Sequence, residues 1–274
     1  MLTKSKQRQL LNALKEYHRR YLKKGITDLD ESGTRLMINS FLTEVLGFAP
    51  IEEVKTEYMI RGTYADYVVQ LKGVQRFLVE VKALSLELSD KHLRQAVNYG
   101  ANEGIEWALL TNGRNFELYK ILFNKPIEAK KVFSVDLSDS SKLKDIVEVI
   151  QYLTKISVAD KGLNILLNKC EALDPTTIAG LLHNKPVVNF VKRALKKKYK
   201  LKFTDDEVIA SINKIINEPI QLDDIKRTTV GKKRKKRDSA DNAENEVIEA
   251  KTETEPVIAA ATTDDVSGVT GEEV

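Results

Sequence analysis

The segment YADYVVQLKGVQRFLVEVKAL, residues 64–84, restricts the fold of this chain more than any other part of the sequence. It predicts two β-strands joined by a turn, with Asp66 on the first strand and Glu80 and Lys82 on the second. Because alternate residues of a strand point to the same side of a sheet, Glu80 and Lys82 share a face. The hairpin therefore gathers charged groups inside an otherwise apolar segment.

The hydrophobic pattern of this hairpin selects its register. A two-residue turn would pair residues whose numbers sum to 145, and the aliphatic sets of the two strands would then be out of phase. Shifting the pairing by one places Tyr67 opposite Val79 and Asp66 opposite Glu80, so that one face is apolar and the other collects the charges. Register follows the hydrophobic pattern, so we predict the second pairing. It requires an odd-length loop or a β-bulge near Gly73.

The charged face of the hairpin has two interpretations. Two carboxylates and an ammonium group are costly to bury without a metal ion or a strong hydrogen-bond partner, and oxygen ligands of this kind suit Mg²⁺. The other interpretation is a surface hairpin in which Asp66 and Glu80 are solvated and form ordinary ion pairs. The hairpin alone leaves both open.

The rest of the first 140 residues predicts helices on either side of this hairpin and a second strand pair beyond it. A helix start signal at Thr27 and Asp28 opens the second helix, and Asn112-Gly113 predicts a type I′ turn. The order of elements is typical of an α/β or α+β fold with a mixed sheet flanked by helices. The predicted helices are 3–24, 28–46 and 90–100, and the predicted strands are 52–60, 107–111, 116–122 and 133–137.

From residue 141 onward the pattern is helical, and we predict three parts of the chain: 1–140, a helical accessory region at 141–228, and a disordered tail at 229–274. The accessory helices are predicted at 143–156, 159–172, from Pro175, at 186–199 and at 205–217. The tail carries a basic run followed by an acidic segment without aromatic residues, which cannot bury enough apolar surface to fold. The basic run is either a contact for nucleic acid, a nuclear address, or part of a solvated tail.

Charge and cysteine content narrow the partners and the compartment. The net charge is only +4, but Lys and Arg cluster on the N-terminal helix and again between residues 192 and 202, and such local basic faces attract polyanions. The single cysteine, Cys170, excludes a disulfide framework within the chain and fits a reducing cytoplasm. No apolar run approaches the roughly 20 residues that span a membrane, and the charged N-terminal helix differs from a secretory signal.

Several short patterns together resemble the N-terminal nuclease domain of the type I restriction enzyme R subunit, which belongs to the PD-(D/E)XK superfamily. The resemblance covers roughly residues 25–125, with weaker similarity to about 220, and the ATP-driven translocase part is not included. An Asp followed by E-x-K is weak alone, but the combination is fairly specific. Ala65 stands where the superfamily has its proline, which this family often lacks. The matching patterns are Glu31…Arg35, Asp66-Tyr67, Glu80-Val81-Lys82, Gln95-Ala96-Val97-Asn98-Tyr99 and Thr111-Asn112-Gly113-Arg114.

The resemblance implies a metal-binding role for several of these residues. Asp66 and Glu80 would be metal ligands, with the carbonyl of Val81 as a third. Glu31 would complete the metal sphere directly or through water, with Glu44 on the same predicted helix as the competing candidate. A favourable charge in the first turn of a helix is the other interpretation of Glu31.

The resemblance also implies roles in catalysis for three residues. Lys82 would orient or help deprotonate the attacking water, or stabilise charge on the phosphorus centre. Gln95 and Tyr99, four residues apart on one helix face, would support the site and contact the DNA backbone. The ordinary interpretations are an ion pair between Lys82 and Glu80, and a plain helix face for the other two.

These roles predict a Mg²⁺-dependent DNA endonuclease of the restriction type, a metal-dependent phosphodiesterase in which Mn²⁺ would substitute for Mg²⁺. DNA is the predicted partner, a double-strand cut favours a homodimer or transient pair, and the family implies restriction–modification subunits as further partners. One alternative is a catalytically silent nucleic-acid-binding module that retains the nuclease fold. Another is a structural or regulatory protein whose acidic tail recruits a partner.

Overall fold

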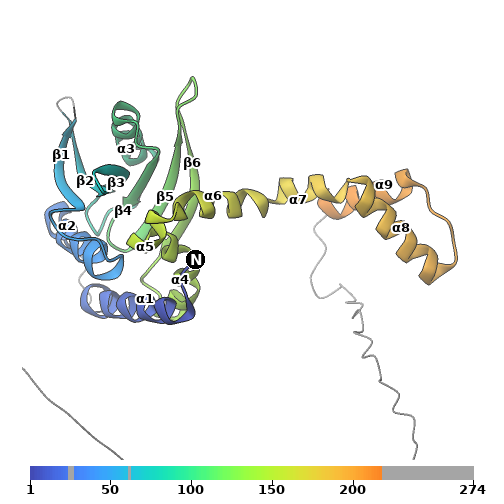
Figure 1. Ribbon diagram of the computed structural model, residues 1–274, viewed down its shortest axis with the longest axis horizontal. Coiled ribbons are helices and arrows are strands. Elements are labelled where there is room, and N and C mark those ends of the chain that lie inside the picture. Colours follow the sequence, from blue (N-terminus) through green and yellow to red (C-terminus); the bar gives the residue numbers. More distant parts are fainter. Residues whose placement is uncertain (24–27, 61–62, 218–274) are drawn as a thin grey trace, which may run out of the picture. The chain divides into compact units, whose positions relative to one another are not determined.

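Six strands form one mixed sheet in the computed structural model, which describes residues 1–23, 28–60 and 63–217 (Figure 1). The strands lie in sequence order, and all neighbours are antiparallel except β3 and β4, which are parallel because α3 (Asp90–Glu103) crosses between them. This confirms the predicted mixed sheet flanked by helices. The strands are β1 (Val54–Ile60), β2 (Thr63–Leu71), β3 (Val74–Val81), β4 (Trp107–Thr111), β5 (Asn115–Leu122) and β6 (Glu128–Asp136).

The register predicted for the β2–β3 hairpin is confirmed. Tyr67 pairs with Val79 and Val69 pairs with Phe77, which is the pairing that collects the apolar residues on one face. The register then shifts by one residue toward the turn, which leaves Arg76 as the extra residue of a β-bulge. The bulge lets one hairpin combine the hydrophobic pairing of its body with a short turn.

The turn of this hairpin is the two-residue turn that Lys72 and Gly73 make available. Leu71 pairs with Val74, and Lys72 and Gly73 both have positive φ, at 53° and 75°. Positive φ at both central positions defines a type I′ turn, whose twist matches that of the flanking strands.

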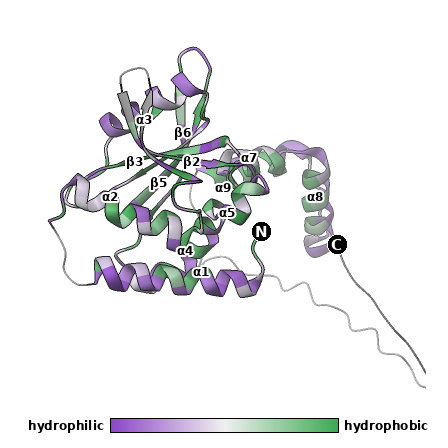
Figure 2. Ribbon diagram, turned by 60° about the vertical axis from the view of Figure 1, so that its left-hand side comes forward, coloured by the Kyte–Doolittle hydropathy of each residue, from purple (hydrophilic) through white to green (hydrophobic). Residues whose placement is uncertain are grey.

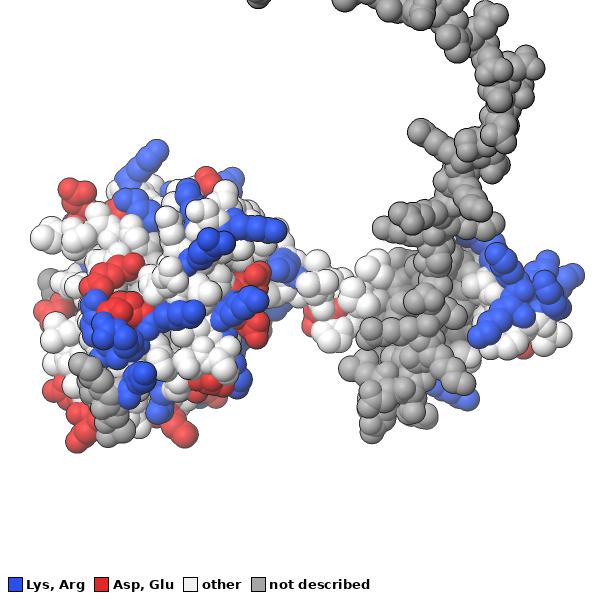
Figure 3. All heavy atoms as spheres, turned by 90° about the horizontal axis from the view of Figure 1, so that it is seen from below, with Lys and Arg blue, Asp and Glu red and all other residues white. Residues whose placement is uncertain are grey.

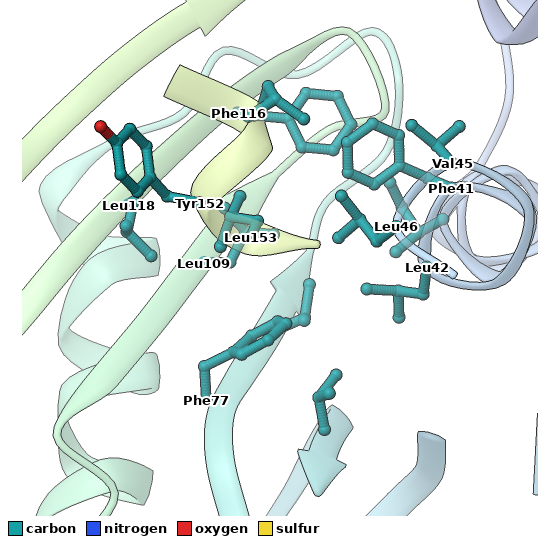
Figure 4. Close-up of a cluster of buried hydrophobic side chains, with 14 of the residues drawn as sticks. Phe41, Leu42, Val45, Leu46, Phe77, Leu109, Phe116, Leu118, Tyr152 and Leu153 are labelled. Atoms are coloured by element: carbon teal, nitrogen blue, oxygen red, sulfur yellow. The ribbon is translucent and has the colours of Figure 1, made fainter. Parts of the chain in front are cut away.

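Helices cover both faces of the sheet. On one face α1 (Lys4–Tyr17), α2 (Glu31–Ser40) and α4 (Leu143–Ile150) pack on the larger core, which is drawn in Figure 4. Figure 2 shows that α1 alternates hydrophilic and hydrophobic residues along its length, as a helix on the rim of a core requires. On the other face α3 packs on a smaller core that includes Ala96 and Leu78.

The second helix begins later than its start signal predicted. Asp30 caps α2, since its carboxylate accepts a hydrogen bond from the Gly33 amide at 2.7 Å. Thr27 lies outside the described residues. Helical spacing predicts Leu36 on the apolar side of this helix, but Leu36 is 73% exposed. The helix continues as a π-helical stretch over Phe41–Val45 and ends as predicted near Gly47, whose φ is +81°.

The hairpin predicted at Asn112-Gly113 is present, but the type I′ turn was wrong. Thr111 pairs with Phe116, so the loop is longer than two residues, and Gly113 alone of the pair has positive φ. The side chain of Asn112 accounts for the difference. Its Oδ1 accepts hydrogen bonds from the amides of Arg114 and Asn115, at 3.1 and 2.7 Å, and thereby holds an open loop.

The helical region after the sheet differs from its prediction at one point. The single helix expected at 143–156 is broken at Thr154, whose extended backbone separates α4 and a 3₁₀ turn from α5 (Lys155–Ala159). The hydroxyl of Thr154 donates to the carbonyl of Gln151 at 2.8 Å and stabilises the break. The later helices lie close to their predicted bounds: α6 (Gly162–Ala172), α7 (Pro175–Leu182), α8 (Lys185–Tyr199) and α9 (Asp205–Asn217).

These helices belong to two hydrophobic clusters. Residues of α4, α5 and α6 as far as Leu166 join the larger core beside the sheet, whereas α8 and α9 share a small core of their own. The division at residue 140 stays a prediction, and the predicted tail at 229–274 lies outside the described residues. Within the described ranges, no helix is both long and apolar enough to cross a membrane.

We predict that Gly100→Ala will destabilise the fold by about 1–3 kcal/mol, because a well-packed site has no room for an added methyl group. A Cβ there would lie 2.3 Å from Cδ1 of Ile121 and 2.7 Å from the carbonyl oxygen of Ile105, which belongs to the backbone and yields little. Urea denaturation of the two proteins would measure the loss.

Gly180→Ala in α7 is the matched control, since nothing lies within 4 Å of the added Cβ. A helical Gly→Ala change in open space should be neutral or stabilise by up to about 1 kcal/mol. Equal effects of the two substitutions would contradict the packing of α3 described above.

Candidate active site

The candidate site lies where β2 separates from β3. The backbone pairing of the hairpin ends at Tyr67 and Val79, and beyond it the carboxylate of Asp66 takes the place of a backbone partner. Its Oδ2 accepts a hydrogen bond from the amide of Val81 at 2.8 Å. This bond fixes Asp66 beside the end of β3, next to the two charged residues that the sequence predicted there.

Glu80 and Lys82 form a buried pair on β3 and just after it. Glu80 is 1% exposed and Lys82 is 8% exposed. The ammonium group of Lys82 donates to Oε1 of Glu80 at 2.6 Å. The other oxygen of Glu80, Oε2, is buried and has no hydrogen-bond partner among the described residues. A buried carboxylate oxygen without a partner is costly, so this atom marks a position that a donor or a cation would satisfy.

Helix α2 adds a carboxylate and a guanidinium group to this site. Oε2 of Glu31, in the first turn, lies 3.6 Å from Nζ of Lys82. Nη1 of Arg35, one turn later, lies 3.4 Å from Oδ1 of Asp66 and also 3.4 Å from Oε1 of Glu57. Residues four apart share a helix face, so one face of α2 supplies both groups.

Two hydrogen bonds hold α2 over the strands. The hydroxyl of Tyr67 donates to the carbonyl of Arg35 at 2.6 Å, and the hydroxyl of Thr34 accepts from the amide of Leu84 at 3.0 Å. The first ties α2 to β2, and the second ties it to the segment after Lys82. The helix is therefore anchored to β2 and to the segment that follows β3.

Burial raises the pKa values of both strand carboxylates. For Glu80 burial raises the pKa to about 7; the hydrogen bond and charge of Lys82 oppose this, and the charges of Asp66 and Glu31 add to it. For Asp66 burial raises the pKa, the Val81 amide lowers it, and the charge of Glu31 raises it again. The charged forms of these acids are thus held together at a cost that a bound cation would relieve.

Lys82 responds in the opposite sense to its surroundings. Burial lowers the pKa of the Lys82 ammonium, but the hydrogen bond that it donates to Glu80 and the charges of Glu80, Glu31 and Asp66 outweigh burial, so that the pKa is raised. Lys82 is therefore protonated at neutral pH. In this state it offers positive charge and hydrogen-bond donors.

The site offers the type of ligand atom that a hard divalent cation prefers, but few acidic side chains to supply it. Carboxylate oxygens are the preferred protein ligands of Mg²⁺, and Oε2 of Glu80 stands without a partner beside Asp66. Across the described residues, however, no group of three or more His, Cys, Asp or Glu side chains is arranged to hold a metal ion. The roles of Asp66, Glu80, Glu31 and the Val81 carbonyl as metal ligands therefore all stay predictions.

The two candidates for an additional acid on the second helix lie in different surroundings. Glu31 lies beside Lys82, as described above. Glu44 pairs with Arg20 at 2.9 Å, and both side chains are exposed. Of the two, Glu31 is the acid that contacts the cluster.

The two site residues predicted on α3, Gln95 and Tyr99, also lie in different surroundings. Gln95 is exposed, whereas Tyr99 is 4% exposed and packs in the smaller core with Ala65 and Leu78. The described part of the chain shows no hydrogen bond from either side chain to the acidic cluster. Their roles at the site stay predictions.

Two residues of this region were missed as site residues. Arg35 was part of the matching pattern, but no role was assigned to it; its spacing from Glu31 was the signal. His92, in the first turn of α3, has a buried Nδ1 without a partner among the described residues. Burial lowers its pKa, the charges of Lys82 and Lys91 lower it further, and the charge of Glu31 raises it. Its place in the first turn of the helix predicted after Lys82 was the available signal.

Comparisons with known proteins agree with the family resemblance. Residues 30–132 match the family described as type I restriction enzyme R protein N terminus, which confirms the resemblance. Among solved structures, a chain of "cryoEM structure DrdV-DNA complex" is similar to this chain at 17% identity, over 52% of this chain and 94% of that chain, with a TM-score of 0.35. A TM-score this low does not show that the two chains share a fold. No curated protein matches the chain.

We predict that the folded protein loses stability through Glu80 as the pH rises in the absence of divalent cations. The pKa of Glu80 is raised to about 7 in the folded protein, so its proton stabilises the fold below the unfolded-state pKa of about 4.3. That stabilisation is lost as the pH rises through about 7, on the order of 3 kcal/mol in all. Urea denaturation of wild type and E80Q in EDTA at several pH values would isolate the contribution of Glu80 to the free energy of unfolding.

E44Q, which removes an exposed acid, is the control, because this change should leave the pH dependence of stability as it is in wild type. A constant difference in unfolding free energy between wild type and E80Q, from about pH 4.5 to 8, would contradict the burial of an ionisable Glu80.

Proposed function

We propose that this chain, whose residues 30–132 match the N-terminal family of type I restriction enzyme R proteins, is a Mg²⁺-dependent DNA endonuclease of the restriction type. The observation that carries the proposal is the buried, unpartnered Oε2 of Glu80 beside Asp66, with Lys82 hydrogen-bonded to the other oxygen. Acids, a lysine and an orphaned ligand atom at the end of two strands are the parts that metal-assisted phosphodiester hydrolysis requires.

The core that we assign is of the PD-(D/E)XK type. Asp66 lies on β2, the Glu80-Val81-Lys82 pattern ends β3, and Gln95 and Tyr99 follow on α3. The end of β3 lies near the start of α2, since Oε2 of Glu31 is 3.6 Å from Nζ of Lys82. This edge of the sheet is where we expect the scissile phosphate to bind.

Asp66 and Glu80 would hold Mg²⁺ or Mn²⁺, with the carbonyl of Val81 as a further oxygen and Glu31 linked directly or through water. When bound, the cation would screen the negative charge of the phosphodiester and assist both the attacking water and the leaving oxygen. The protein contributes rigidity, because the Val81 amide and Arg35 fix Asp66 before any ligand arrives.

Lys82 would act through its charge. It is protonated at neutral pH and held 2.6 Å from Glu80. Its remaining donors are available to orient the attacking water and to stabilise the charge that develops on the phosphate oxygens. Gln95 and Tyr99 would support the site from α3.

The partners follow from the same proposal. Duplex DNA is the substrate, and one centre per chain favours a homodimer or a transient pair for a double-strand cut. Restriction–modification subunits are the further partners that the family match suggests. The second candidate function is a DNA-binding module that no longer cuts. It is favoured by the lack of a third acidic ligand around Glu80 among the described residues.

Plasmid cleavage in Mg²⁺ or Mn²⁺ tests the proposal. We predict that wild type cuts supercoiled DNA, that D66N and E80Q abolish cutting, and that K82A slows it by about 10²–10⁴-fold. E44Q is the matched control and should cut like wild type, because Glu44 pairs with Arg20 away from the cluster. Wild type that binds duplex DNA but never cuts it with either cation would support the silent module instead.

We further predict that Glu31 supports metal binding and that Glu44 does not. Thermal unfolding with increasing Mn²⁺ should show a rise in Tm for wild type, because a ligand that binds only the folded state stabilises it. E31Q should require about tenfold more Mn²⁺ for the same rise, and E44Q should match wild type. The same titration curve for E31Q and wild type would assign Glu31 to the ion pair with Lys82 alone.

A further inference from the structure

Helices α8 and α9 form a small helical pair with its own core. Val188 on α8 is buried against Val208 and Ile212 on α9. The connection is ordered by a capping box, in which the Glu207 amide donates to the hydroxyl of Thr204 at 3.2 Å and the Thr204 amide donates to the Glu207 carboxylate at 2.7 Å. The pair is a rigid support for the side chains on its surface.

One side of this pair is an open groove of about 600 Å³. Three of the lining residues, Asn189, Arg193 and Lys196, recur at spacings of four and three and so share one face of α8. The groove is closed at one end by the loop before α9. Its principal lining residues are Asn189, Lys192, Arg193, Lys196, Lys202 and Phe203.

The groove is strongly positive. No acidic residue lies between Lys185 and Thr204, and Figure 3 shows the Lys and Arg side chains gathered at this end of the chain. Asp205 neutralises part of the charge, since it pairs with Lys192 and lies 3.3 Å from Lys185. These contacts anchor the first turn of α9 to α8.

Three other cations of the groove form no such ion pair with α9. Arg193, Lys196 and Lys202 are exposed and form no ion pair within the part of the chain that the structure describes. The Nε of Arg193 donates a hydrogen bond to the carbonyl of Asn189 at 3.3 Å, within the same helix. Cations along one helix face that no carboxylate of the described residues neutralises fit a ligand with repeated negative charges. Asn189 adds a side chain that can donate to a phosphate oxygen.

We propose that the α8–α9 groove binds the phosphate backbone of duplex DNA, apart from the acidic cluster at the end of β3. The inference rests on the proposed function for its choice of polyanion. Binding there would be independent of sequence, because phosphate contacts position a protein on DNA and base contacts specify the site. The groove would supply affinity for DNA even without a divalent cation. The acidic cluster would not, because it repels phosphate until its cation is bound.

Two double variants of the full chain test this. R193A/K196A removes two groove cations, and K197A/K198A removes two cations of the same helix that do not line the groove. Both would be made in the E80Q background and measured in EDTA by fluorescence anisotropy with a 30-bp duplex. Circular dichroism would verify that the helices remain, and all four substituted side chains are exposed.

We expect R193A/K196A to bind about tenfold more weakly at 0.15 M salt and to lower the slope of log K against log salt by about 2. K197A/K198A should lose less than threefold. Equal losses in the two variants would mean diffuse attraction and overturn the groove. Unchanged affinity of R193A/K196A, or groove-dependent binding that favours RNA over the duplex, would overturn it as well.

The assay separates this inference from the nuclease proposal. If wild type binds the duplex through the groove and never cuts it, the nuclease proposal fails and the groove stands. If wild type cuts DNA and R193A/K196A binds as tightly as its parent, the groove alone fails.

Discussion

The hydrogen bond from the Val81 amide to the Asp66 carboxylate is the contact on which the candidate site depends. A continued β-ladder would use that amide for a backbone carbonyl and would close β2 against β3. Because a side chain takes the amide instead, the strands separate at this point while the donor remains satisfied. Asp66 is thereby set beside Glu80. Helix α2 is tied to β2 through Tyr67 and to the segment after β3 through Thr34, and it covers the opening with Glu31 and Arg35.

Without a ligand, this arrangement of buried charges is unfavourable for folding. Glu80 is almost completely buried with one oxygen unpartnered, and burial raises its pKa despite the ion pair with Lys82. Removing a charge from water costs more than a single partner returns unless the remaining lone pairs are also satisfied. The large core on the other face of the sheet, with Phe41, Phe77 and Phe116, provides the stability that offsets this cost. Sites of this kind are typical of proteins that trade stability for function.

The parts of this structure that could be predicted from the sequence are those that local patterns decide. The register of the β2–β3 hairpin follows from its apolar residues, and the face shared by Glu80 and Lys82 follows from strand geometry. The parts that could not be predicted depend on groups distant in the chain or on a side chain competing with the backbone. Arg35 reaches Asp66 only once α2 has docked, and Asn112 opens a turn that its dipeptide would otherwise tighten. Thr154 interrupts a helix whose periodicity continues across it, because its hydroxyl bonds to the backbone one turn earlier.

Under the proposed function, the charges of the site would make a cation necessary before DNA could bind there. Four carboxylates (Asp66, Glu80, Glu31 and Glu57) lie around two cations (Lys82 and Arg35), so these groups carry two net negative charges when all are ionised. A phosphodiester carries the same sign and is repelled. One divalent cation would offset this charge, and near the buried Glu80 the effect would be weakly screened by solvent and salt. If both proposals hold, the acidic cluster would admit DNA only with a divalent cation present, whereas the basic groove of α8 and α9 would attract DNA at all times. Cation-independent binding and cation-dependent cutting would then be separate properties of separate surfaces.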